Sequence, residues 1–206
     1  MLPFSEPCER NKDAILDILK RVFDDRTSVL EIGSGTGQHA CYFAQNLPYL
    51  NWQPTDFGDY LPGLEARLNL SDLPNLPTAI ELDVRTGDVP QGGFDAVFSA
   101  NTLHIMSADA VECVFSLVGK VLETGGLLAV YGPFNYNGVY SSESNQRFDV
   151  WLKSQNPESA IRDFEWVGSL AKEAGFELLE DNVMPANNQL LVWRKRGGAI
   201  DAIPKK

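Results

Sequence analysis

The sequence has little cysteine and no long apolar run, and these absences exclude several classes of protein. Its three cysteines lie far apart and outside any CxxC spacing, so neither a disulfide framework nor a zinc site is expected. No apolar run approaches the roughly 18 residues that span a bilayer, and residues 1–12 lack the basic and apolar regions of a signal peptide. We therefore expect a cytoplasmic protein that binds no membrane and holds no metal ion.

Positive charge is scarce as well. There are 17 lysines and arginines against 28 aspartates and glutamates, which gives a formal net charge of −11. Such a charge repels a phosphate backbone, and the only dense basic run is residues 194–196, so no nucleic-acid partner is expected. The length of 206 residues predicts one domain, 1–206, with a flexible tail at 197–206. Nothing in the sequence indicates the oligomeric state.

Predicted strands and helices alternate along the chain, which is typical of a parallel sheet. The expected strands are the segments 28–32, 51–56, 78–84, 94–100, 127–132, 176–184 and 189–196. The expected helices run over about 9–23, from the glycine turn to about 45, and over 62–70, 107–123, 145–153 and 164–174, with Ser107 as an N-cap. Only the turn "PANN" joins the last two strands, so they must pair antiparallel. We expect an α/β fold with a doubly wound, Rossmann-like sheet of seven strands, mainly parallel, with a C-terminal antiparallel hairpin.

The segment "VLEIGSGTGQH", residues 29–39, joins a strand to a helix through three glycines. A phosphate-binding loop needs lysine and then serine or threonine after its last glycine, where this chain has Gln38 and His39. A dinucleotide fingerprint needs a glycine at position 38 to pack the helix closely against the strand. The first kind of loop is therefore excluded, and a nicotinamide cofactor is disfavoured.

What remains, Glu31-x-Gly33-x-Gly35-x-Gly37, resembles motif I of the class I S-adenosylmethionine-dependent methyltransferases. The resemblance implies that S-adenosyl-L-methionine is the cofactor and S-adenosyl-L-homocysteine the product. It also implies that Gly33, Ser34, Gly35 and Gly37 approach the cofactor closely, and that Glu31 places negative charge near its amino-acid end.

Further polar residues stand at the ends of later strands, where that superfamily has its other motifs. Asp56 ends the second strand and is expected to accept hydrogen bonds from both ribose hydroxyls. The resemblance places Asp83 on the adenine amino group, Val84 on the adenine face and Asn101 beside the cofactor. Simpler roles remain open, because Asp56 also begins a turn and Asp83 also ends a strand.

A narrower resemblance rests on the segments "ERNKDAIL", "YGPFNYNG", "SNQRFDVWL", "IRDFEWVGSLAKEAGF" and "MPANNQLLVW". Together they are similar to the methyltransferase-like twenty-six group, a family whose domain has no assigned function. This resemblance implies a fold and a cofactor but no reaction.

Ligands of a doubly wound sheet bind beyond the carboxyl ends of its strands. Seven polar residues are predicted to reach that edge and to bind the substrate: Arg10, Asn11, Asn135, Tyr136, Arg162, Asn187 and Asn188. Their amides and guanidinium groups would form a pocket for a small polar or anionic acceptor. Structural roles, as turn formers or ion-pair partners, remain open for them.

His104 is the candidate catalytic residue. A general base is needed only if the acceptor arrives protonated, as an alcohol or amine, and histidine titrates near neutrality. His104 could instead be a partly buried histidine whose hydrogen bonds are satisfied. We expect His39 to be solvated and the three cysteines to lie in the core.

Together these motifs predict an S-adenosylmethionine-dependent methyltransferase that acts on a small polar or anionic molecule. Two alternatives remain open. The first is a non-catalytic S-adenosylmethionine-binding protein with a regulatory or scaffold role, and the second, less favoured, is an NAD-dependent dehydrogenase.

Overall fold

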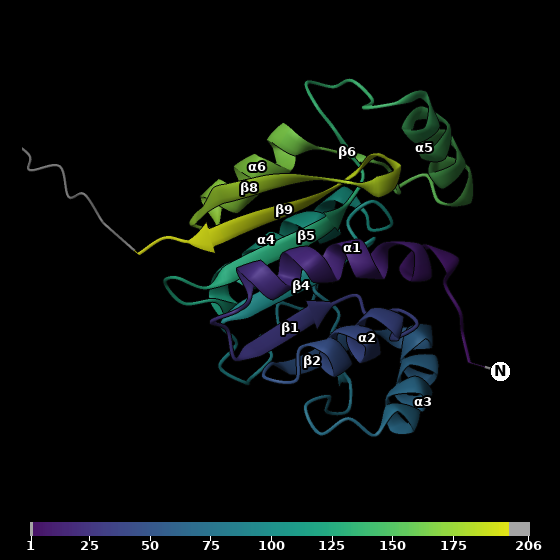
Figure 1. Cartoon of the computed structure of the whole chain (residues 1–206). Coiled ribbons are helices and arrows are strands. Elements are labelled where there is room, and N and C mark those ends of the chain that lie inside the picture. Colours follow the sequence, from purple (N-terminus) through teal and green to yellow (C-terminus); the bar gives the residue numbers. More distant parts are fainter. Residues whose placement is uncertain (1, 198–206) are drawn as a thin grey trace, which may run out of the picture.

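Seven strands form one twisted sheet in the order β3-β2-β1-β4-β5-β9-β8 (Figure 1). The computed structural model describes residues 2–197. The strands are β1 Ser28–Ile32, β2 Asn51–Asp56, β3 Ile80–Glu81, β4 Ala96–Ala100, β5 Leu127–Gly132, β8 Phe176–Met184 and β9 Asn188–Lys195. Strands β1 to β5 pair parallel, whereas β9 pairs antiparallel with both β5 and β8. The predicted α/β fold with its C-terminal hairpin is therefore confirmed, and β8 runs in the direction of the parallel strands.

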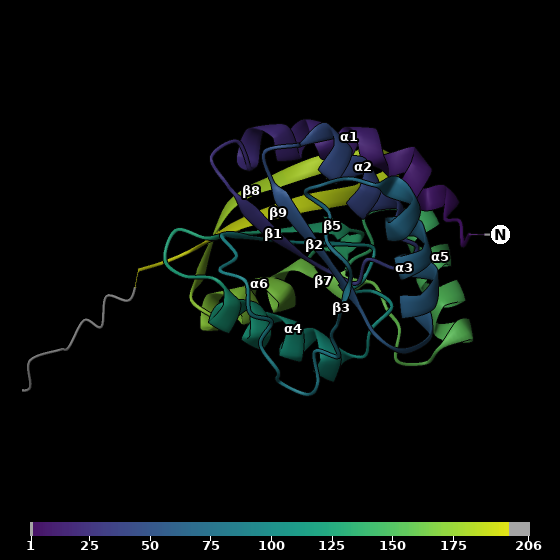
Figure 2. The ribbon, with the colours of Figure 1, turned by 90° about the horizontal axis from the view of Figure 1, so that it is seen from below.

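Helices cover both faces of the sheet, as Figure 2 shows. On one face lie α1 Glu6–Val22, α2 Gln38–Asn46 and α3 Leu61–Ser71, and on the other lie α4 Ala108–Val121 and α6 Phe164–Glu173. The helix α5 Glu143–Gln155 stands at the end of the sheet, and two 3-10 turns, η1 Gly58–Tyr60 and η2 Pro185–Asn187, complete the elements. Among residues 2–197, no helix combines the length and the apolar character that crossing a bilayer requires.

Two hydrophobic clusters hold the layers together, one on each face of the sheet. Side chains alternate across a strand, so Phe98 of β4 packs beneath α1 and α2 while its neighbour Val97 packs beneath α4. All five residues of β1 and of β4 are buried, as expected for parallel strands that helices cover on both faces. Cys41 and Cys113 pack against these clusters but are only half-buried, as is Cys8, so the expectation that the cysteines lie in the core is wrong.

Some boundaries differ from the sequence predictions. The first helix begins at Glu6, three residues early, because Pro7 fits its first turn without losing a needed hydrogen bond. The third strand is reduced to Ile80–Glu81, which pair only with the last two residues of β2. Of the predicted tail, only Gly197 belongs to the described residues, and 198–206 lie outside them.

A second, two-stranded sheet was not predicted from the sequence. Its strands are β6 Phe134–Asn135 and β7 Arg162–Asp163, which pair parallel. Asp163 of β7 is also the residue immediately before α6. This pairing holds the segment after β5 against the segment before α6.

Replacing Ser107 tests how α4 is fixed beside the sheet. Ser107 has the predicted N-cap role, and its hydroxyl accepts a hydrogen bond from the backbone N–H of Ala110 at 3.3 Å. Ser107→Ala should lower the free energy of unfolding by about 1 kcal/mol, because that N–H loses its partner. Urea titration measures the change. The exposed Ser154→Ala should stay within about 0.5 kcal/mol of the wild type, and equal losses in both variants would contradict the N-cap role.

Candidate functional site

The glycine loop, residues 33–37 between β1 and α2, folds back onto the end of β2. The N–H groups of Gly33 and Ser34 donate to the carbonyl oxygen of Thr55 at 3.1 and 2.9 Å. Gly35 N–H donates to Oδ2 of Asp56 at 2.6 Å. The loop is thereby fixed at the carboxyl edge, the edge of the sheet at which β1, β2, β4 and β5 end.

The three glycines of the loop serve two different purposes, although all have positive φ, between 54° and 75°. A Cβ on Gly33 would lie 2.7 Å from Oγ1 of Thr102, and one on Gly37 would lie 2.8 Å from Cδ1 of Leu64. These two glycines let neighbouring segments pack closely. A Cβ on Gly35 would meet nothing within 4 Å, so its backbone faces open space that a ligand can enter.

Glu31 lies beneath this loop and is only 1% exposed. Its Oε2 accepts hydrogen bonds from Ser34 Oγ at 2.9 Å and from Trp52 Nε1 at 3.0 Å. Burial raises the pKa of Glu31 to about 7, and the two donors oppose this rise. A nearby cation would favour the carboxylate form, because it would offset the cost of burying the charge.

The acidic residues after β2 and β3 differ in their surroundings. Asp56 is 7% exposed and accepts from the N–H groups of Gly35 and Phe57, while burial raises its pKa. Asp83 forms an ion pair with Arg85 at 2.7 Å, which lowers its pKa, and the Arg85 guanidinium lies over the Phe57 ring. The side chain of Val84 is buried in the cluster beneath α4, so little of it faces a ligand at the edge.

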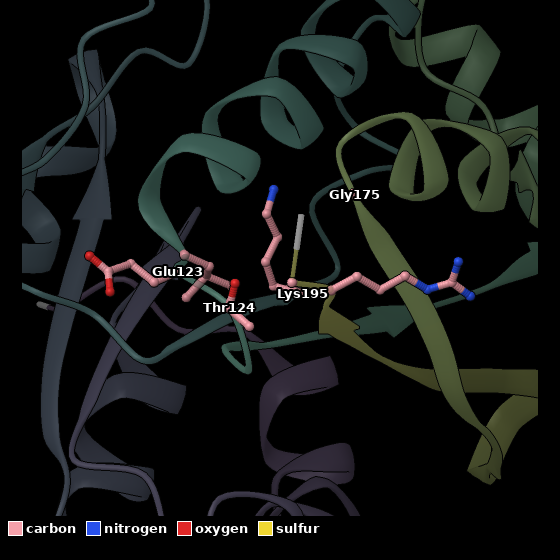
Figure 3. A pocket seen from close by; sticks show the side chains of 7 residues that line it. Glu123, Thr124, Gly175 and Lys195 are labelled. Atoms are coloured by element: carbon pink, nitrogen blue, oxygen red, sulfur yellow. The ribbon is translucent and has the colours of Figure 1, made fainter. Parts of the chain in front are cut away.

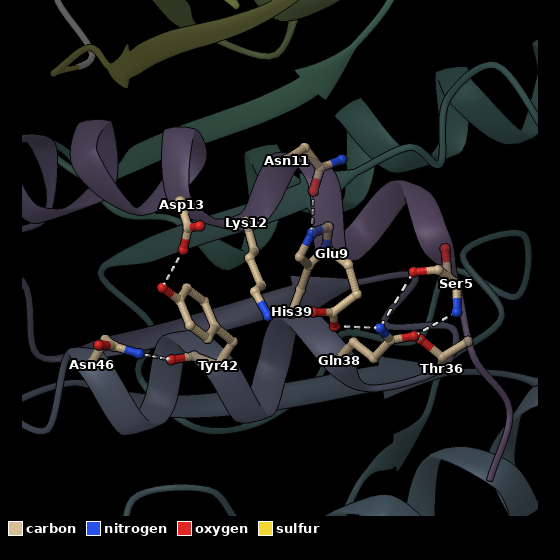
Figure 4. Close-up of polar contacts among 10 residues, drawn as sticks. All are labelled: Ser5, Glu9, Asn11, Lys12, Asp13, Thr36, Gln38, His39, Tyr42 and Asn46. Atoms are coloured by element: carbon tan, nitrogen blue, oxygen red, sulfur yellow. Dashed lines mark hydrogen bonds and ion pairs between the residues drawn. The ribbon is translucent and has the colours of Figure 1, made fainter. Parts of the chain in front are cut away.

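Gln38, the residue that breaks the dinucleotide fingerprint, fastens the start of α1 over the glycine loop (Figure 4). Its Oε1 accepts from the N–H of Ser5 at 2.6 Å, and its Nε2 donates to Oε1 of Glu9 at 2.6 Å. The Arg67 side chain donates to the carbonyl oxygen of Thr36 at 2.6 Å and also to that of Pro3. A glycine at position 38 could make neither of the two Gln38 side-chain contacts.

His39 is buried, so the expectation that it is solvated is wrong. It is 5% exposed, its ring stacks on Phe43, and its Nε2 donates to Oδ1 of Asn11 at 2.7 Å (Figure 4). The proton is on Nε2 because an amide oxygen can only accept. Burial lowers the pKa of His39 to about 4. The neutral ring therefore joins α2 to α1.

Tyr131, near the end of β5, was not singled out from the sequence. It is 3% exposed, and this burial raises the pKa of its hydroxyl. The side chains of Asn11 and Asn188 face the hydroxyl, and their hydrogen bonding opposes the rise in pKa. Its position at the carboxyl end of a parallel strand could have identified Tyr131 from the sequence as a candidate site residue. The structure thus brings Asn11 and Asn188 together, although 177 positions separate them in the chain.

His104 lies just beyond β4 and is 6% exposed. Its Nδ1 is 3.6 Å from the position that a Cβ on Gly132 would occupy, and its ring meets the Phe148 ring edge-on. Burial, with a smaller effect of the Arg162 charge, lowers the pKa of His104 to about 4. The expectation that His104 titrates near neutrality is therefore wrong, and the imidazole is neutral at pH 7.

Arg162 holds the loop that carries His104. Its guanidinium donates to the carbonyl oxygen of Leu103 at 3.1 Å, to that of Met106, and to that of Glu158 at 2.9 Å. These bonds satisfy three carbonyl groups near His104. The guanidinium is thus committed to the backbone and is a poor candidate for binding an anionic substrate.

Three of the other predicted substrate residues have partners away from Arg162. Arg10 is 67% exposed at its side chain and pairs with Glu6 at 2.7 Å, so its guanidinium lies on the surface. The Tyr136 hydroxyl donates to Asp181 at 2.8 Å, and its ring stacks on Phe164. Asn187 is exposed, with a φ of 57°, and donates to Ser144 Oγ, as suits a turn residue.

Asn101 and Asn135 both hold buried atoms that have no hydrogen-bond partner among residues 2–197. In Asn101 the unpartnered atom is Nδ2. The backbone of Asn101 has a φ of 56°, and its N–H donates to the Tyr131 carbonyl oxygen. Asn135, 9% exposed, donates from Nδ2 to the Ile161 carbonyl oxygen at 3.5 Å, and its Oδ1 is unpartnered. Such atoms carry a cost unless a ligand or water bonds them.

A hollow at the opposite edge of the sheet has a structural explanation (Figure 3). Its lining comes from the end of α4, the start of β8 and the end of β9: Leu122, Glu123, Thr124, Gly175, Lys195, Arg196 and Gly197. Lys195 Nζ donates to the carbonyl oxygen of Gly119 at 3.0 Å and to that of Ala174. It satisfies carbonyl groups where α4 and α6 end, so the charge here supports the fold.

The buried His39 predicts a loss of stability in acid. In the unfolded chain its pKa is near 6.5 and in the folded chain about 4, so protons favour the unfolded state between these values. Stability should therefore fall as the pH falls from 6.5 to 4, by roughly 3 kcal/mol from this residue. Urea titrations of wild type and His39→Gln at pH 7 and pH 4 measure the difference.

Glu31 acts in the opposite direction, since its raised pKa makes the folded state bind the proton more tightly. Both proteins contain Glu31 and His104, so their effects are common to wild type and variant. If His39→Gln lost as much stability in acid as the wild type, His39 would not be the buried neutral group described.

Known proteins resemble this chain in fold and in part of its sequence. It is 31% identical over 119 residues to the uncharacterized methyltransferase Mb0092 of Mycobacterium bovis, a match that covers 57% of this chain and 55% of that protein. An O-methyltransferase family protein from Burkholderia thailandensis matches with a TM-score of 0.77 and 17% identity, over 91% of this chain and 57% of that chain. Human N-acetylserotonin methyltransferase, solved with S-adenosylmethionine, matches with a TM-score of 0.73 and 15% identity, over 90% of this chain and 55% of that chain.

The chain thus spans about half the length of these relatives, and at such identities the solved structures establish the fold alone. They confirm the predicted methyltransferase-like sheet, including its antiparallel β9. The fold is therefore that of the solved methyltransferases, and the chain belongs to the family described as "Protein of unknown function (DUF938)", whose model matches residues 2–195.

Proposed function

We propose that this chain is an S-adenosylmethionine-dependent methyltransferase that methylates a hydroxyl oxygen of a small polar molecule, with His104 as the general base. The observation that carries the proposal is the open face of Gly35, which has nothing within 4 Å of a Cβ position and lies directly beside Asp56. A glycine backbone exposed next to a buried carboxylate suits a ligand that brings hydroxyl groups close to the loop.

The atoms around the glycine loop match the polar groups of the cofactor. Each Asp56 oxygen accepts one backbone hydrogen bond, which leaves lone pairs for two ribose hydroxyls. Glu31 uses only Oε2 for its bonds to Ser34 and Trp52, so Oε1 can accept from the ammonium of the methionine moiety. The unpartnered Nδ2 of Asn101 can donate to its carboxylate. When bound, the cofactor supplies an activated methyl group, and the protein supplies orientation.

His104 is placed to take a proton at the same edge. Being neutral at pH 7, its imidazole can accept the proton of the acceptor hydroxyl as the oxygen is methylated. Arg162 keeps its loop in place through the carbonyl groups of Leu103 and Met106. A pKa of about 4 makes His104 a weak base, so it suits an acidic hydroxyl, such as a phenol with a pKa of about 10, better than an alkyl alcohol. The name of the Burkholderia thailandensis protein, an O-methyltransferase, supports the same chemistry.

Binding of S-adenosylhomocysteine tests the cofactor proposal. Calorimetry should detect binding to the wild type, and Asp56→Ala and Gly35→Ala should each weaken it by about tenfold or more. The first change removes the acceptor for the ribose hydroxyls, and the second fills the open space beside the loop.

Gly93→Ala is the matched control for Gly35→Ala. Gly93 has a φ of 60°, and a Cβ there would also meet nothing within 4 Å, so both variants carry the same kind of backbone strain. Gly93 precedes β4, at the edge of the sheet opposite the glycine loop. Its variant should bind S-adenosylhomocysteine as the wild type does. No binding by the wild type, or equal weakening by both alanine variants, would refute the assigned cofactor position.

Turnover with methyl-labelled S-adenosylmethionine and a metabolite extract tests the role of His104. His104→Gln should reduce methyl transfer by about 100-fold, within the range for loss of a general base, while S-adenosylhomocysteine still binds. With saturating S-adenosylmethionine, whose ammonium would keep Glu31 ionised, the wild-type kcat/KM for the acceptor should be flat from pH 8 to 6 and fall only as the pH approaches about 4, where His104 becomes protonated. Binding of the cofactor with no turnover of any extract component would favour a regulatory or scaffold protein instead.

A further inference from the structure

Two buried amide oxygens stand without a hydrogen-bond partner on the side of the carboxyl edge where His104 lies. They are Oδ1 of Asn135 and Oε1 of Gln189, and no residue among 2–197 donates to either. An unsatisfied buried acceptor costs free energy in the free protein. A persistent pair of them beside a candidate base therefore points to a ligand that supplies the missing donors.

The register of the sheet places Gln189 beside His104. Gln189 of β9 is directly opposite Gly132 of β5 in an antiparallel ladder. Directly opposite residues point to the same face of a sheet. His104 Nδ1 lies 3.6 Å from the position of a Cβ on Gly132. Gln189 and His104 therefore flank the same glycine on the same face.

Asn135 is tied to the His104 loop through one short segment. The N–H of Ala160 donates to the His104 carbonyl oxygen at 3.0 Å, and the next carbonyl, that of Ile161, accepts from Asn135 Nδ2 at 3.5 Å. Because a carbonyl can only accept, the Asn135 amide must turn its nitrogen toward Ile161 and its oxygen away. The unpartnered Oδ1 is thus the free end of a side chain held next to this loop.

The groups collected here are neutral hydrogen-bond acceptors. A neutral imidazole and two amide oxygens offer no positive charge to an anion. The two guanidinium groups that suggested an anionic acceptor are engaged elsewhere, since Arg10 pairs with Glu6 on the surface and Arg162 binds backbone carbonyl groups. The net charge of −11 also disfavours an anionic ligand.

We propose that Asn135 and Gln189 determine acceptor specificity, and that the acceptor is a neutral molecule carrying a second hydrogen-bond donor next to its reacting hydroxyl. This inference rests on the proposed methyltransferase function. The reacting hydroxyl gives its proton to His104 as its oxygen takes the methyl group from the sulfonium, and the hydrogen of the adjacent O–H or N–H is shared between the two amide oxygens. Catechol, which has two adjacent phenolic hydroxyls, is the simplest probe with this arrangement.

Turnover of three probes by the full chain tests the proposal. Catechol has the second donor, phenol lacks it, and salicylate replaces it with an anion. The wild type should methylate catechol with a kcat/KM about tenfold or more above that for phenol and for salicylate. Asn135→Leu and Gln189→Leu should each remove most of this preference by slowing catechol while leaving phenol unchanged.

Thermal stability separates a specificity role from a structural one. Because Gln189→Leu removes an unsatisfied buried oxygen, its melting temperature should equal or exceed that of the wild type. Asn135→Leu also loses the 3.5 Å hydrogen bond to the Ile161 carbonyl oxygen, so the stability test is made at Gln189. A purely structural amide would instead lose stability when replaced. Gln189→Met gives the same test with less change in shape, in case a leucine does not fit there. The exposed Gln91→Leu is the control, and it should keep both the catechol preference and the stability.

The failures of the two proposals are distinguishable. Equal rates for catechol and phenol, a preference for salicylate, or a catechol preference that survives both variants would overturn the specificity role. If S-adenosylhomocysteine binds but none of the three probes is methylated, the acceptor class is wrong and the cofactor site stands. If S-adenosylhomocysteine does not bind, the proposed function itself fails.

Discussion

The carbonyl oxygen of Thr55 fixes the position of the glycine loop, and the rest of the candidate site depends on that position. It accepts from two successive N–H groups of the glycine loop, and Asp56, the next residue, accepts from a third. These bonds tie the end of β1 to the end of β2 and turn the chain sharply enough for α2 to begin at Gln38. Because Gln38 then holds Ser5 and Glu9, the position of α1 also depends on this turn. One short loop therefore sets both the backbone that faces the proposed cofactor site and the helix that lies over it.

Basic side chains at the carboxyl edge mostly stabilise the backbone, while neutral groups lie where the methyl acceptor is proposed to bind. Arg162 and Arg67 donate to main-chain carbonyl oxygens, and His39 is held neutral between α1 and α2. A guanidinium has several donors in fixed directions, so it can satisfy two or three carbonyl groups of an irregular loop at once. This use of arginine fixes the loop around His104 while the guanidinium donors stay bonded to backbone oxygens.

The layered fold could be predicted from the sequence because its signals are local. Buried strands are continuous apolar runs, Ser107 marks the start of α4, and a short turn can join β8 to β9 only as an antiparallel pair. What the sequence could not indicate depends on distant partners. Two-residue strands such as β6 and β7 carry no periodicity, nothing local says that β9 enters beside β5, and nothing distinguishes an arginine that will bind carbonyl groups from one that will bind a substrate. Glycine spacing identified the loop, but it could not distinguish the roles of the glycines. The structure shows that Gly33 packs against Thr102, whereas nothing lies within 4 Å of a Cβ on Gly35.

The interior position of β9 has a consequence for how the chain folds during synthesis. Translation delivers β5 and β8 first, yet in the finished sheet they are separated by a strand that is made after both. Until β9 leaves the ribosome, β5 and β8 each have an edge without a partner strand. The apolar side chains that pack against Leu190 to Trp193 in the finished fold are exposed to water during this time. Open edges of this kind are where chains associate wrongly. The half of the sheet that carries Gln189 and the Tyr131 contact therefore closes last, so the proposed acceptor site forms only once β9 has been inserted.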